Sequence, residues 1–381
     1  MYYKCRRKSL RVLFPFVGDS VGGSHISTLE LYSSLVDKGI HVFILIHECD
    51  GPLSQYLHNK KIPFSIMKVS RLAGEYPGIL PIAISILTNF FRFSRFIKMH
   101  KIDIVHGNDL RINLSWSLPA KIFSKGFVWH QRTLLSSSKI WVLIQFLCSY
   151  FIAISDVVMQ SAPKGISVYK KKTVYNPFNV NLTIDKKLAR ECTAKEYGIQ
   201  HGSFLLGYVG RIVDYKNVDF ILKSLSNIRY KDVHLLIVGS GEEDYINELK
   251  LYADTLGIKD RVTFTGFVNN PSAVITSLDV LIASSQIDAF GRTIVEAMLQ
   301  KTPVIAAKSG GHIDIIQDGI NGLFYNVEVV NDLSEKISFI YNNARFRGEV
   351  VSEAYLFAKN KFSSDSHLSK IMHIYDLVNE N

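Results

Sequence analysis

Residues 204–228, FLLGYVGRIVDYKNVDFILKSLSNI, contain the pattern that decides the fold. Phe204–Val209 is a short, largely apolar run, and Val218–Ile228 has apolar residues at helical spacing. A buried strand that leads through a short loop into a helix is the repeating unit of a parallel α/β sheet. This stretch therefore predicts a doubly wound α/β domain around it.

The same strand and helix unit recurs on both sides of this stretch. Runs rich in β-branched residues alternate with longer helical patterns, which is typical of βαβ units. The chain therefore predicts two doubly wound, Rossmann-like α/β domains in tandem. Further strands are expected at Arg11–Phe16, His41–Ile46, Ile102–His106, Phe127–His130, Tyr150–Ile154, His234–Val238, Val262–Thr265, Val280–Ala283, Pro303–Ala306 and Leu323–Tyr325.

A change of pattern near Asn176-Pro177 suggests the domain boundary. We expect a first domain at 1–176, a linker at 177–200, a second domain at 201–362 and a last helix at 363–381. The linker carries a charged helical stretch. We expect the last helix to pack back on the first domain.

The composition excludes a disordered chain, since 47% of the 381 residues are hydrophobic and 12% are aromatic. The formal net charge of +10 is unevenly spread: residues 1–180 hold 23 Lys and Arg against 9 Asp and Glu, and residues 181–381 hold 21 against 25. A basic first half is compatible with nucleic acid, an anionic membrane or a phosphorylated substrate. Charge alone does not choose among these.

Cysteine spacing and apolar runs indicate a cytoplasmic location. The uncharged apolar runs Ile79–Phe91 and Ile140–Ile154 are shorter than the roughly 18–20 residues that span a bilayer, so no membrane-spanning helix is expected. The cysteines are scattered without a Cys-x-x-Cys pair, which favours reduced thiols. They are Cys5, Cys49, Cys148 and Cys192.

Ligands of open α/β sheets bind at the carboxyl ends of the strands, so the loops that follow the strands are the candidate sites. Gly22 and Gly23 precede an expected helix, Ile26–Lys38, whose free N–H groups attract phosphate; a plain turn is the alternative. Arg211 and Lys216 follow the strand Phe204–Val209 and suit a diphosphate, although ordinary surface cations would look the same.

Gly239 follows the next strand, in Gly239-Ser240-Gly241. A dinucleotide-binding fingerprint needs glycine where Asp244 stands, which excludes a Rossmann dehydrogenase. The turn still allows close approach to a nucleotide.

The loop around Phe290 and Gly291 carries the strongest pattern, with Asp288 before it and Glu296 on the helix Thr293–Gln300. The two acids suit two parts of an extended ligand, and Gly291 leaves backbone N–H groups open to phosphate. A helix-capping Asp288 and a solvated Glu296 are the alternative. The paired glycines Gly310-Gly311 form a fifth loop.

Together these segments resemble glycosyltransferase family 4, retaining nucleotide-sugar transferases of GT-B architecture, in which two Rossmann-like domains face a central cleft. The resemblance covers roughly residues 11–325 and is strongest from 204 onward. The motifs stand in the order of the family: Val209-Gly210-Arg211 with Lys216, Leu236–Gly239 with Gly241, Phe264–Phe267, Phe290-Gly291 with Glu296-Ala297-Met298, and Gly310-Gly311 with Asp318-Gly319.

The resemblance implies a role for each matching residue. Arg211 and Lys216 would hold the donor diphosphate, Glu296 the nucleotide ribose, and Asp288 would lie beside the donor sugar. Phe290 and Gly291 would offer their backbone to sugar and phosphate. The same resemblance places Gly239 at the donor, Gly22 and Gly23 over the diphosphate, and His130 near the reacting sugar. By residue type alone, His130 is an ordinary strand-end histidine.

One departure concerns the donor sugar, because the family usually has glutamate where this chain has Asp288. The carboxylate is kept but is one methylene shorter, which puts the identity of the sugar in doubt.

The resemblance implies transfer of a sugar from a nucleoside diphosphate sugar to a glycan or lipid-linked acceptor, with retention and without a metal or other cofactor. Cell-surface polysaccharide or glycolipid synthesis is the expected setting. A GT-B sugar-nucleotide epimerase and a non-catalytic nucleotide-sugar-binding protein are the alternatives. Nucleic acid is not expected as a partner, because no recognised binding module accompanies the basic half.

The basic half also contains an amphipathic candidate at Ile79–Lys101, where phenylalanines mix with arginines and lysines. That composition is typical of a helix that lies at a membrane interface. We therefore expect peripheral contact with an anionic membrane that carries the acceptor. A partly buried helix with a solvated cationic edge is the alternative.

Overall fold

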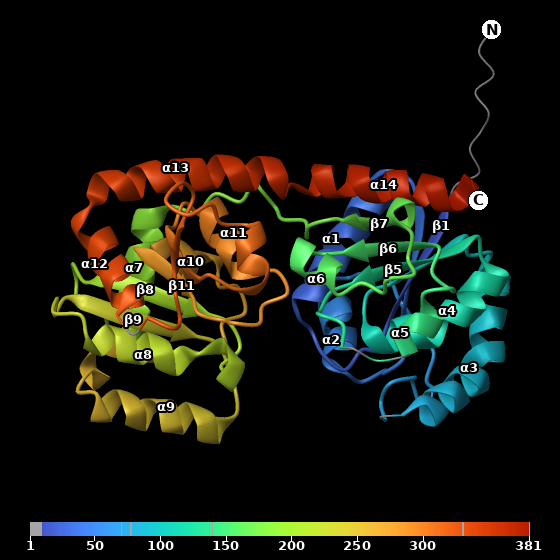
Figure 1. The fold of residues 1–381 in the computed structure, drawn as a ribbon, viewed down its shortest axis with the longest axis horizontal. Coiled ribbons are helices and arrows are strands. Elements are labelled where there is room, and N and C mark those ends of the chain that lie inside the picture. The colour runs from blue at the N-terminus through green and yellow to red at the C-terminus, as the bar shows by residue number, and fades with distance from the viewer. Residues whose placement is uncertain are drawn as a thin grey trace, which may run out of the picture. The chain divides into compact units, whose positions relative to one another are not determined.

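The computed structural model describes residues 10–69, 71–76, 78–136, 138, 140–329 and 331–380. The chain divides into two compact units, each built around one sheet (Figure 1). The first unit is Met1–Phe178 with Ser364–Asn381, and the second is Asn179–Ser363. Every pairing of neighbouring strands in the two sheets is parallel, which confirms the predicted fold class.

The first sheet has seven strands in the order β3-β2-β1-β4-β5-β6-β7. The chain moves outward from β1 to one edge, returns, and continues from β4 to the other edge. This reversal between β1 and β4 is the switch point of a doubly wound fold. The strands are β1 (Arg11–Phe16), β2 (His41–Ile46), β3 (Ser65–Ile66), β4 (Ile104–Gly107), β5 (Gly126–Gln131), β6 (Tyr150–Ala153) and β7 (Lys171–Thr173).

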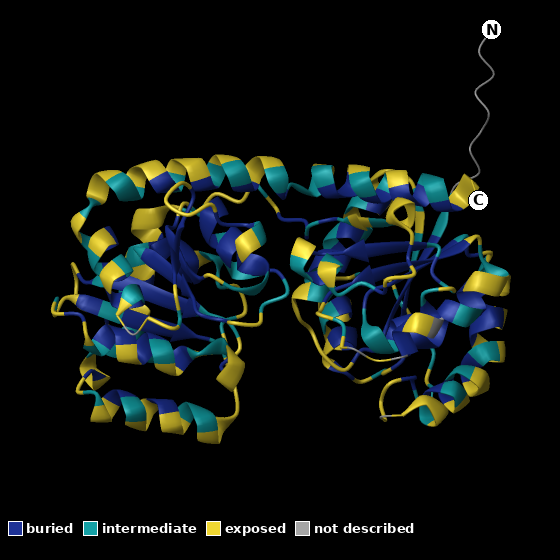
Figure 2. Ribbon diagram, in the orientation of Figure 1, coloured by how far each residue is buried: buried dark blue, intermediate teal, exposed yellow. Residues whose placement is uncertain are grey.

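Helices cover the first sheet, and apolar side chains from them and from the strands form a buried core (Figure 2). The last helix, α14, belongs to this unit and contributes Ile371, Ile374 and Tyr375 to that core. The helices are α1 (Gly23–Asp37), α2 (Pro52–Asn59), α3 (Ile79–His100), α4 (Leu110–Phe123), α5 (Ile140–Ile144), α6 (Asp156–Gln160), the 3₁₀ turn η1 (Val168–Lys170) and α14 (Ser364–Glu380).

The helix α3 is longer than its uncharged run suggested, because it continues through the cationic residues up to His100. By length and composition it could cross a membrane, contrary to the expectation from the sequence, and 28% of its most apolar window is buried. Core helices of globular proteins pass the same test, and α3 packs against α4. Length and composition therefore do not distinguish a membrane-crossing helix from a core helix in the case of α3.

The second sheet has six strands in the order β10-β9-β8-β11-β12-β13. Its switch point lies between β8 and β11, which pair through Leu206 with Val280 and Gly207 with Leu281. The strands are β8 (Phe204–Val209), β9 (Val233–Val238), β10 (Val262–Gly266), β11 (Val280–Ala283), β12 (Val304–Ala307) and β13 (Leu323–Tyr325).

Helix α7 occupies half of the segment expected as a linker, and it packs on α10 as part of the second unit. The Arg190 guanidinium on α7 lies 3.0 Å from the Asp279 carboxylate, which ties the helix to the sheet. The helices of this unit are α7 (Lys186–Tyr197), η2 (Asp214–Lys216), α8 (Val218–Ser226), α9 (Glu243–Thr255), η3 (Lys259–Arg261), α10 (Ser272–Ser277), α11 (Arg292–Leu299), η4 (Gly310–Asp314), α12 (Asp332–Asn342) and α13 (Ala344–Lys361).

Candidate functional site

The switch point of the second sheet brings two predicted site residues together. Lys216 ends the turn η2 after β8, and Asp288 lies in the loop after β11. Because β8 and β11 are neighbours, their carboxyl ends place these loops side by side. Lys216 Nζ lies 2.8 Å from Asp288 Oδ2, and the Ser284 hydroxyl donates to the Lys216 carbonyl.

Asp288 is a strongly stabilised carboxylate. Burial by itself would raise its pKa, but the neighbouring His312 and Lys216 outweigh burial and hold the pKa well below the ordinary value of 3.8. His312 Nε2 lies 3.6 Å from Oδ2, and its Nδ1 pairs with the Ala307 carbonyl at 3.0 Å. A carboxylate that stays ionised beside a lysine can accept hydrogen bonds from sugar hydroxyls.

The paired glycines hold the Asp288 loop by direct backbone contact. The Gly311 N–H donates to the Asp288 carbonyl at 2.7 Å. A Cβ at Gly310 would lie 2.5 Å from that carbonyl oxygen, and a Cβ at Gly311 would lie 2.5 Å from the Phe290 Cα. Side chains at either position would push the two loops apart, so these glycines fix where Asp288 stands.

The remaining residues of this loop present backbone rather than rings. Phe290 is 3% exposed and its ring makes an edge contact with Phe362, so the ring serves the core and not a ligand. Gly291 has φ +100° and caps the N-terminus of α11, which leaves helix N–H groups without a capping side chain. Glu296 lies one turn into α11 and is 3.4 Å from Arg292.

Arg211 is exposed just beyond β8, where its guanidinium donates to the Tyr215 hydroxyl at 2.6 Å. Gly239 allows the loop after β9 to touch the loop that carries Arg211. A Cβ at Gly239 would lie 1.8 Å from the Gly210 carbonyl oxygen, and its φ is +146°. The second unit thus places two cations, one acid and a helix N-terminus along the carboxyl ends of β8, β9 and β11.

In the first unit, Gly22 caps α1 and Gly23 is its first residue. The Gly22 N–H donates to His25 Nδ1 at 3.1 Å, and no atom lies within 4 Å of a Cβ placed at Gly22. The preceding turn is tied to the start of α4, because Arg111 lies 2.6 Å from Asp19. Gly22 and Gly23 are therefore both exposed at a helix N-terminus, with open space beside Gly22.

His130 lies inside β5, and its side chain is fully enclosed in this structure. His106 on the neighbouring strand β4 pairs with it, with His106 Nε2 3.0 Å from His130 Nδ1. Burial, with the charge of Arg132 acting in the same direction, lowers the pKa of both histidines well below 6.5. His130 is thus a neutral, buried ring, which a ligand could meet only if its neighbours moved.

Arg132 follows the end of β5, and the sequence motifs did not identify it as a site residue. Its guanidinium donates to Asn108 at 2.7 Å and to Asn176 at 2.6 Å, and the residue is 8% exposed. His312 in the second unit was also not singled out. Both stand within three residues of a quoted motif residue, and that proximity is the only signal the sequence offers for them. Among the described residues, no group of three or more His, Cys, Asp or Glu side chains is arranged to hold a metal ion.

Two family models match the chain, one in each half. The model of glycosyl transferases group 1 matches residues 190–357, and the model of Glycosyltransferase Family 4 matches residues 21–182. An uncharacterized glycosyltransferase of Methanocaldococcus jannaschii is 26% identical over 220 residues, 55% of each chain. A poly(ribitol-phosphate) alpha-N-acetylglucosaminyltransferase of Staphylococcus aureus is 24% identical over 173 residues, 45% of this chain and 35% of its own.

The chain therefore spans about half the length of the curated relatives it matches, or less. Among solved structures, HepE of Anabaena in complex with UDP aligns with a TM-score of 0.79 at 21% identity, over 96% of this chain and 98% of HepE. That alignment shows the same fold in both units. With one model on each half and GT-B enzymes among its relatives, the chain belongs to the GT-B glycosyltransferases of the family 4 type.

Proposed function

We propose that the protein transfers a sugar from a nucleoside diphosphate sugar to a glycan or lipid-linked acceptor, with retention at the anomeric carbon. The observation that carries this proposal is the cluster at the switch point of the second sheet, where Lys216 and Asp288 meet 2.8 Å apart and Arg211 stands beyond the same strand as Lys216. Family membership supports the reaction class, and HepE was solved with UDP.

In this proposal Arg211 and Lys216 bind the diphosphate and stabilise the negative charge that grows on it as the sugar leaves. Gly291 and the N-terminus of α11 add backbone N–H groups. Glu296 accepts from ribose hydroxyls, and Gly239 lets the backbone come close. No cofactor or metal is assigned to this step, because two side-chain cations supply the charge.

Asp288 accepts hydrogen bonds from the donor sugar in this proposal. Its Oδ2 is held by Lys216 and faces His312. Aspartate in place of the usual glutamate shortens the reach toward the sugar, so the preferred donor is expected to differ from that of glutamate-containing relatives.

The experiment that tests the reaction measures release of nucleoside diphosphate from a panel of UDP-, GDP- and dTDP-hexoses, with and without a lipid extract of bacterial envelopes. Release that depends on the extract, with the anomeric configuration of the product equal to that of the donor, is expected. Conversion of the donor sugar without acceptor would identify the epimerase alternative. Binding without any conversion would identify the non-catalytic alternative.

We further propose that the first unit docks on an anionic membrane, at its cytoplasmic face, to reach the acceptor. The exposed apolar residues of α3 follow helical spacing: Leu80, Ile84, Leu87 and Phe91 are 71%, 48%, 65% and 78% exposed. The same stripe continues at Arg95 and Lys98, which are exposed as well. The apolar part of such a stripe can contact lipid tails, and its cations can contact anionic headgroups.

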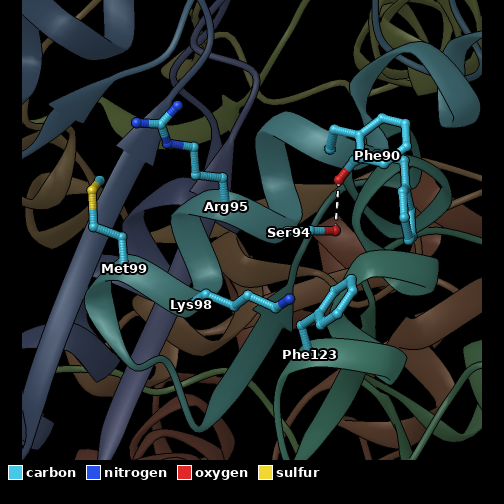
Figure 3. A pocket seen from close by; sticks show the side chains of 7 residues that line it. Phe90, Ser94, Arg95, Lys98, Met99 and Phe123 are labelled. Atoms are coloured by element: carbon cyan, nitrogen blue, oxygen red, sulfur yellow. Dashed lines mark hydrogen bonds between the residues drawn. The ribbon is translucent and has the colours of Figure 1, made fainter.

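The cationic end of this stripe contains a pocket of about 640 Å³ between α3 and α4 (Figure 3). Lys98 reaches across it, with Nζ 4.1 Å from the centre of the Phe123 ring. An aromatic floor with cations at the rim suits a phospholipid, whose chain is apolar and whose phosphate is charged. The lining includes Phe90, Phe91, Phe123, Met99, Arg95 and Lys98.

Flotation with vesicles of phosphatidylglycerol and phosphatidylcholine tests the docking proposal. Leu87→Ser with Phe91→Ser is expected to reduce the floated fraction at least fivefold, and Arg95→Gln with Lys98→Gln to make binding insensitive to the anionic lipid. Leu251→Ser on α9 is the control, since Leu251 is 67% exposed and lies in the other unit. Wild-type protein that ignores anionic vesicles at low salt would contradict the proposal.

A further inference from the structure

Three buried side chains from distant parts of the sequence form a line in the core of the first unit. Tyr375 on α14 lies with its hydroxyl 2.6 Å from His106 Nδ1, and His106 Nε2 lies 3.0 Å from His130 Nδ1. Tyr375, His106 and His130 are all 0% exposed. Each ring nitrogen in such a line either donates or accepts, so the positions of the protons can be worked out.

Arg132 fixes the direction at one end of the line. Its guanidinium, which can only donate, lies 3.4 Å from His130 Nδ1. That nitrogen therefore carries a lone pair, and the proton of the neutral His130 ring is on Nε2. His106 then donates from Nε2, which leaves its Nδ1 as an acceptor for the Tyr375 hydroxyl.

The opposite direction is unfavourable at both ends. A proton on His130 Nδ1 would face the N–H groups of Arg132. The Tyr375 hydroxyl would accept from His106, and its own proton would need another acceptor in a fully buried place, where an unmet donor is destabilising. Burial also raises the pKa of Tyr375 well above 10, so the phenol keeps its proton.

A fourth residue, His367 on α14, offers an acceptor that matches the donor at the His130 end of the line. Its Nδ1 lies 2.7 Å from the Tyr175 carbonyl and must donate to it, so its Nε2 is an acceptor. His130 Nε2 and His367 Nε2 are both buried without a partner among the described residues. The two rings are nearly parallel with centroids 6.3 Å apart, and each carries an unsatisfied Nε2, a donor on His130 and an acceptor on His367.

We infer that Tyr375, His106 and His130 form a one-way hydrogen-bond chain, and that a buried water molecule bridges its end, His130 Nε2–H, to His367 Nε2. Water both accepts and donates, which is what this pair requires. The chain keeps the imidazoles beside Arg132 neutral and oriented, so that the guanidinium at the end of β5 is the only charge of this group. Tyr375 is therefore a positioning residue that holds His106, and through it His130, from the last helix.

Long-range ¹H–¹⁵N correlation spectra of the full-length protein, labelled in histidine, test the chain directly because they distinguish the two tautomers. We expect His106 and His130 protonated on Nε2, His367 on Nδ1, and a cross-relaxation peak between water and the His130 Nε2 proton. A proton on Nδ1 of His130, or a missing water peak with the tautomers as expected, would overturn the chain or the bridge respectively.

Tyr375→Phe adds a test that a purely structural role would not satisfy. Without the hydroxyl, His106 Nδ1 loses the hydrogen bond that it accepts, so its ¹⁵N resonance is expected to move downfield, while the proton stays on Nε2, where His130 Nδ1 accepts it, and the fold is kept. Tyr341→Phe is the matched control, since the Tyr341 hydroxyl bonds Asp232 in the second unit. Unchanged signals of His106 in Tyr375→Phe would contradict the inferred direction. These measurements do not use sugar transfer, so they stand apart from the proposed function.

Discussion

Lys216 and Asp288 form an ion pair in which each partner has a second use in the proposed reaction. Their side chains are only 16% and 28% exposed, so the 2.8 Å contact is less screened than a surface pair. A diphosphate that binds Lys216 competes with Asp288 for the ammonium group. The ion pair therefore weakens the affinity for a nucleoside diphosphate that carries no sugar.

Asp288→Asn is expected to relieve this competition. The affinity for free nucleoside diphosphate should rise about three- to tenfold, which is roughly 1 kcal/mol, while sugar transfer falls at least 100-fold. Calorimetric titration with UDP and GDP, together with the transfer assay, measures both. Asp254→Asn is the control, because Asp254 pairs with Lys259 at 3.6 Å on the surface. Loss of diphosphate affinity in Asp288→Asn would contradict the competition.

Because it contains buried histidines, the first unit is expected to have a lower free energy of unfolding in mild acid. Burial lowers the pKa of His47 to about 4 and that of His367 to about 3. The unfolded chain binds protons near pH 6.5 whereas the folded unit does not, so stability falls as pH drops below 6.5 toward these values. These two histidines alone lower the free energy of unfolding by about 3 kcal/mol between pH 6.5 and pH 5.

Urea unfolding followed by tryptophan fluorescence measures this loss. The three tryptophans of the chain, Trp116, Trp129 and Trp141, all lie in the first unit, so their signal reports on that unit. A free energy of unfolding that stays constant from pH 7 to pH 5 would show that these rings can take up protons without unfolding.

At the scale of elements, glycines decide how closely neighbouring loops approach. Gly239→Ala would place a methyl group 1.8 Å from the Gly210 carbonyl oxygen, at a φ of +146° that side chains rarely adopt. We expect a loss of at least about 2 kcal/mol in stability and weaker donor binding, because the displaced loop carries Arg211. Thermal unfolding and nucleotide titration check the two effects.

Gly348→Ala is the matched control for this substitution. Gly348 lies within α13, and no atom comes within 4 Å of an added Cβ. Alanine in a helix interior is expected to stabilise the second unit by about 1 kcal/mol. Unchanged stability and nucleotide affinity in Gly239→Ala would mean that the contact between these two loops does not position Arg211.

The elements themselves could largely be predicted from periodicity. The strands Phe204–Val209 and Val280–Ala283 were predicted with the bounds that β8 and β11 have. The two-residue strand β3 was missed, because Ser65 and Ile66 carry no repeating pattern. Helix α3 agrees to within one residue with the amphipathic candidate Ile79–Lys101, because its apolar and cationic residues share one helical stripe.

The positions of residues relative to the predicted strands also indicated part of the candidate site. Asp288, Gly291 and Lys216 stand in loops after strands, where an α/β sheet binds ligands. The pairing of Lys216 with Asp288 could not be predicted, because it depends on β8 and β11 being neighbours across 72 residues of sequence. The chain of Tyr375, His106 and His130 joins residues 269 apart and left no local pattern.

At the scale of the whole molecule, charge separates the two proposed tasks. The second half of the chain has 21 basic and 25 acidic residues, and its proposed donor site relies on two individually placed cations, Arg211 and Lys216. The first half, with 23 against 9, has a basic excess that the donor does not use. That division agrees with an acceptor or membrane surface for the first unit and a nucleotide for the second.

The measurement that tests the central claim most directly is titration calorimetry of the wild-type protein and of the double variant Arg211→Ala with Lys216→Ala, using UDP, GDP and their hexose conjugates. The wild type is expected to bind at least one of these at one site per chain. The double variant should bind it at least about 100-fold more weakly, because two charge-assisted contacts are lost, and its circular dichroism at the titration temperature should show that it is still folded. Equal affinity in the double variant, or no nucleotide binding by the wild type, would contradict the account.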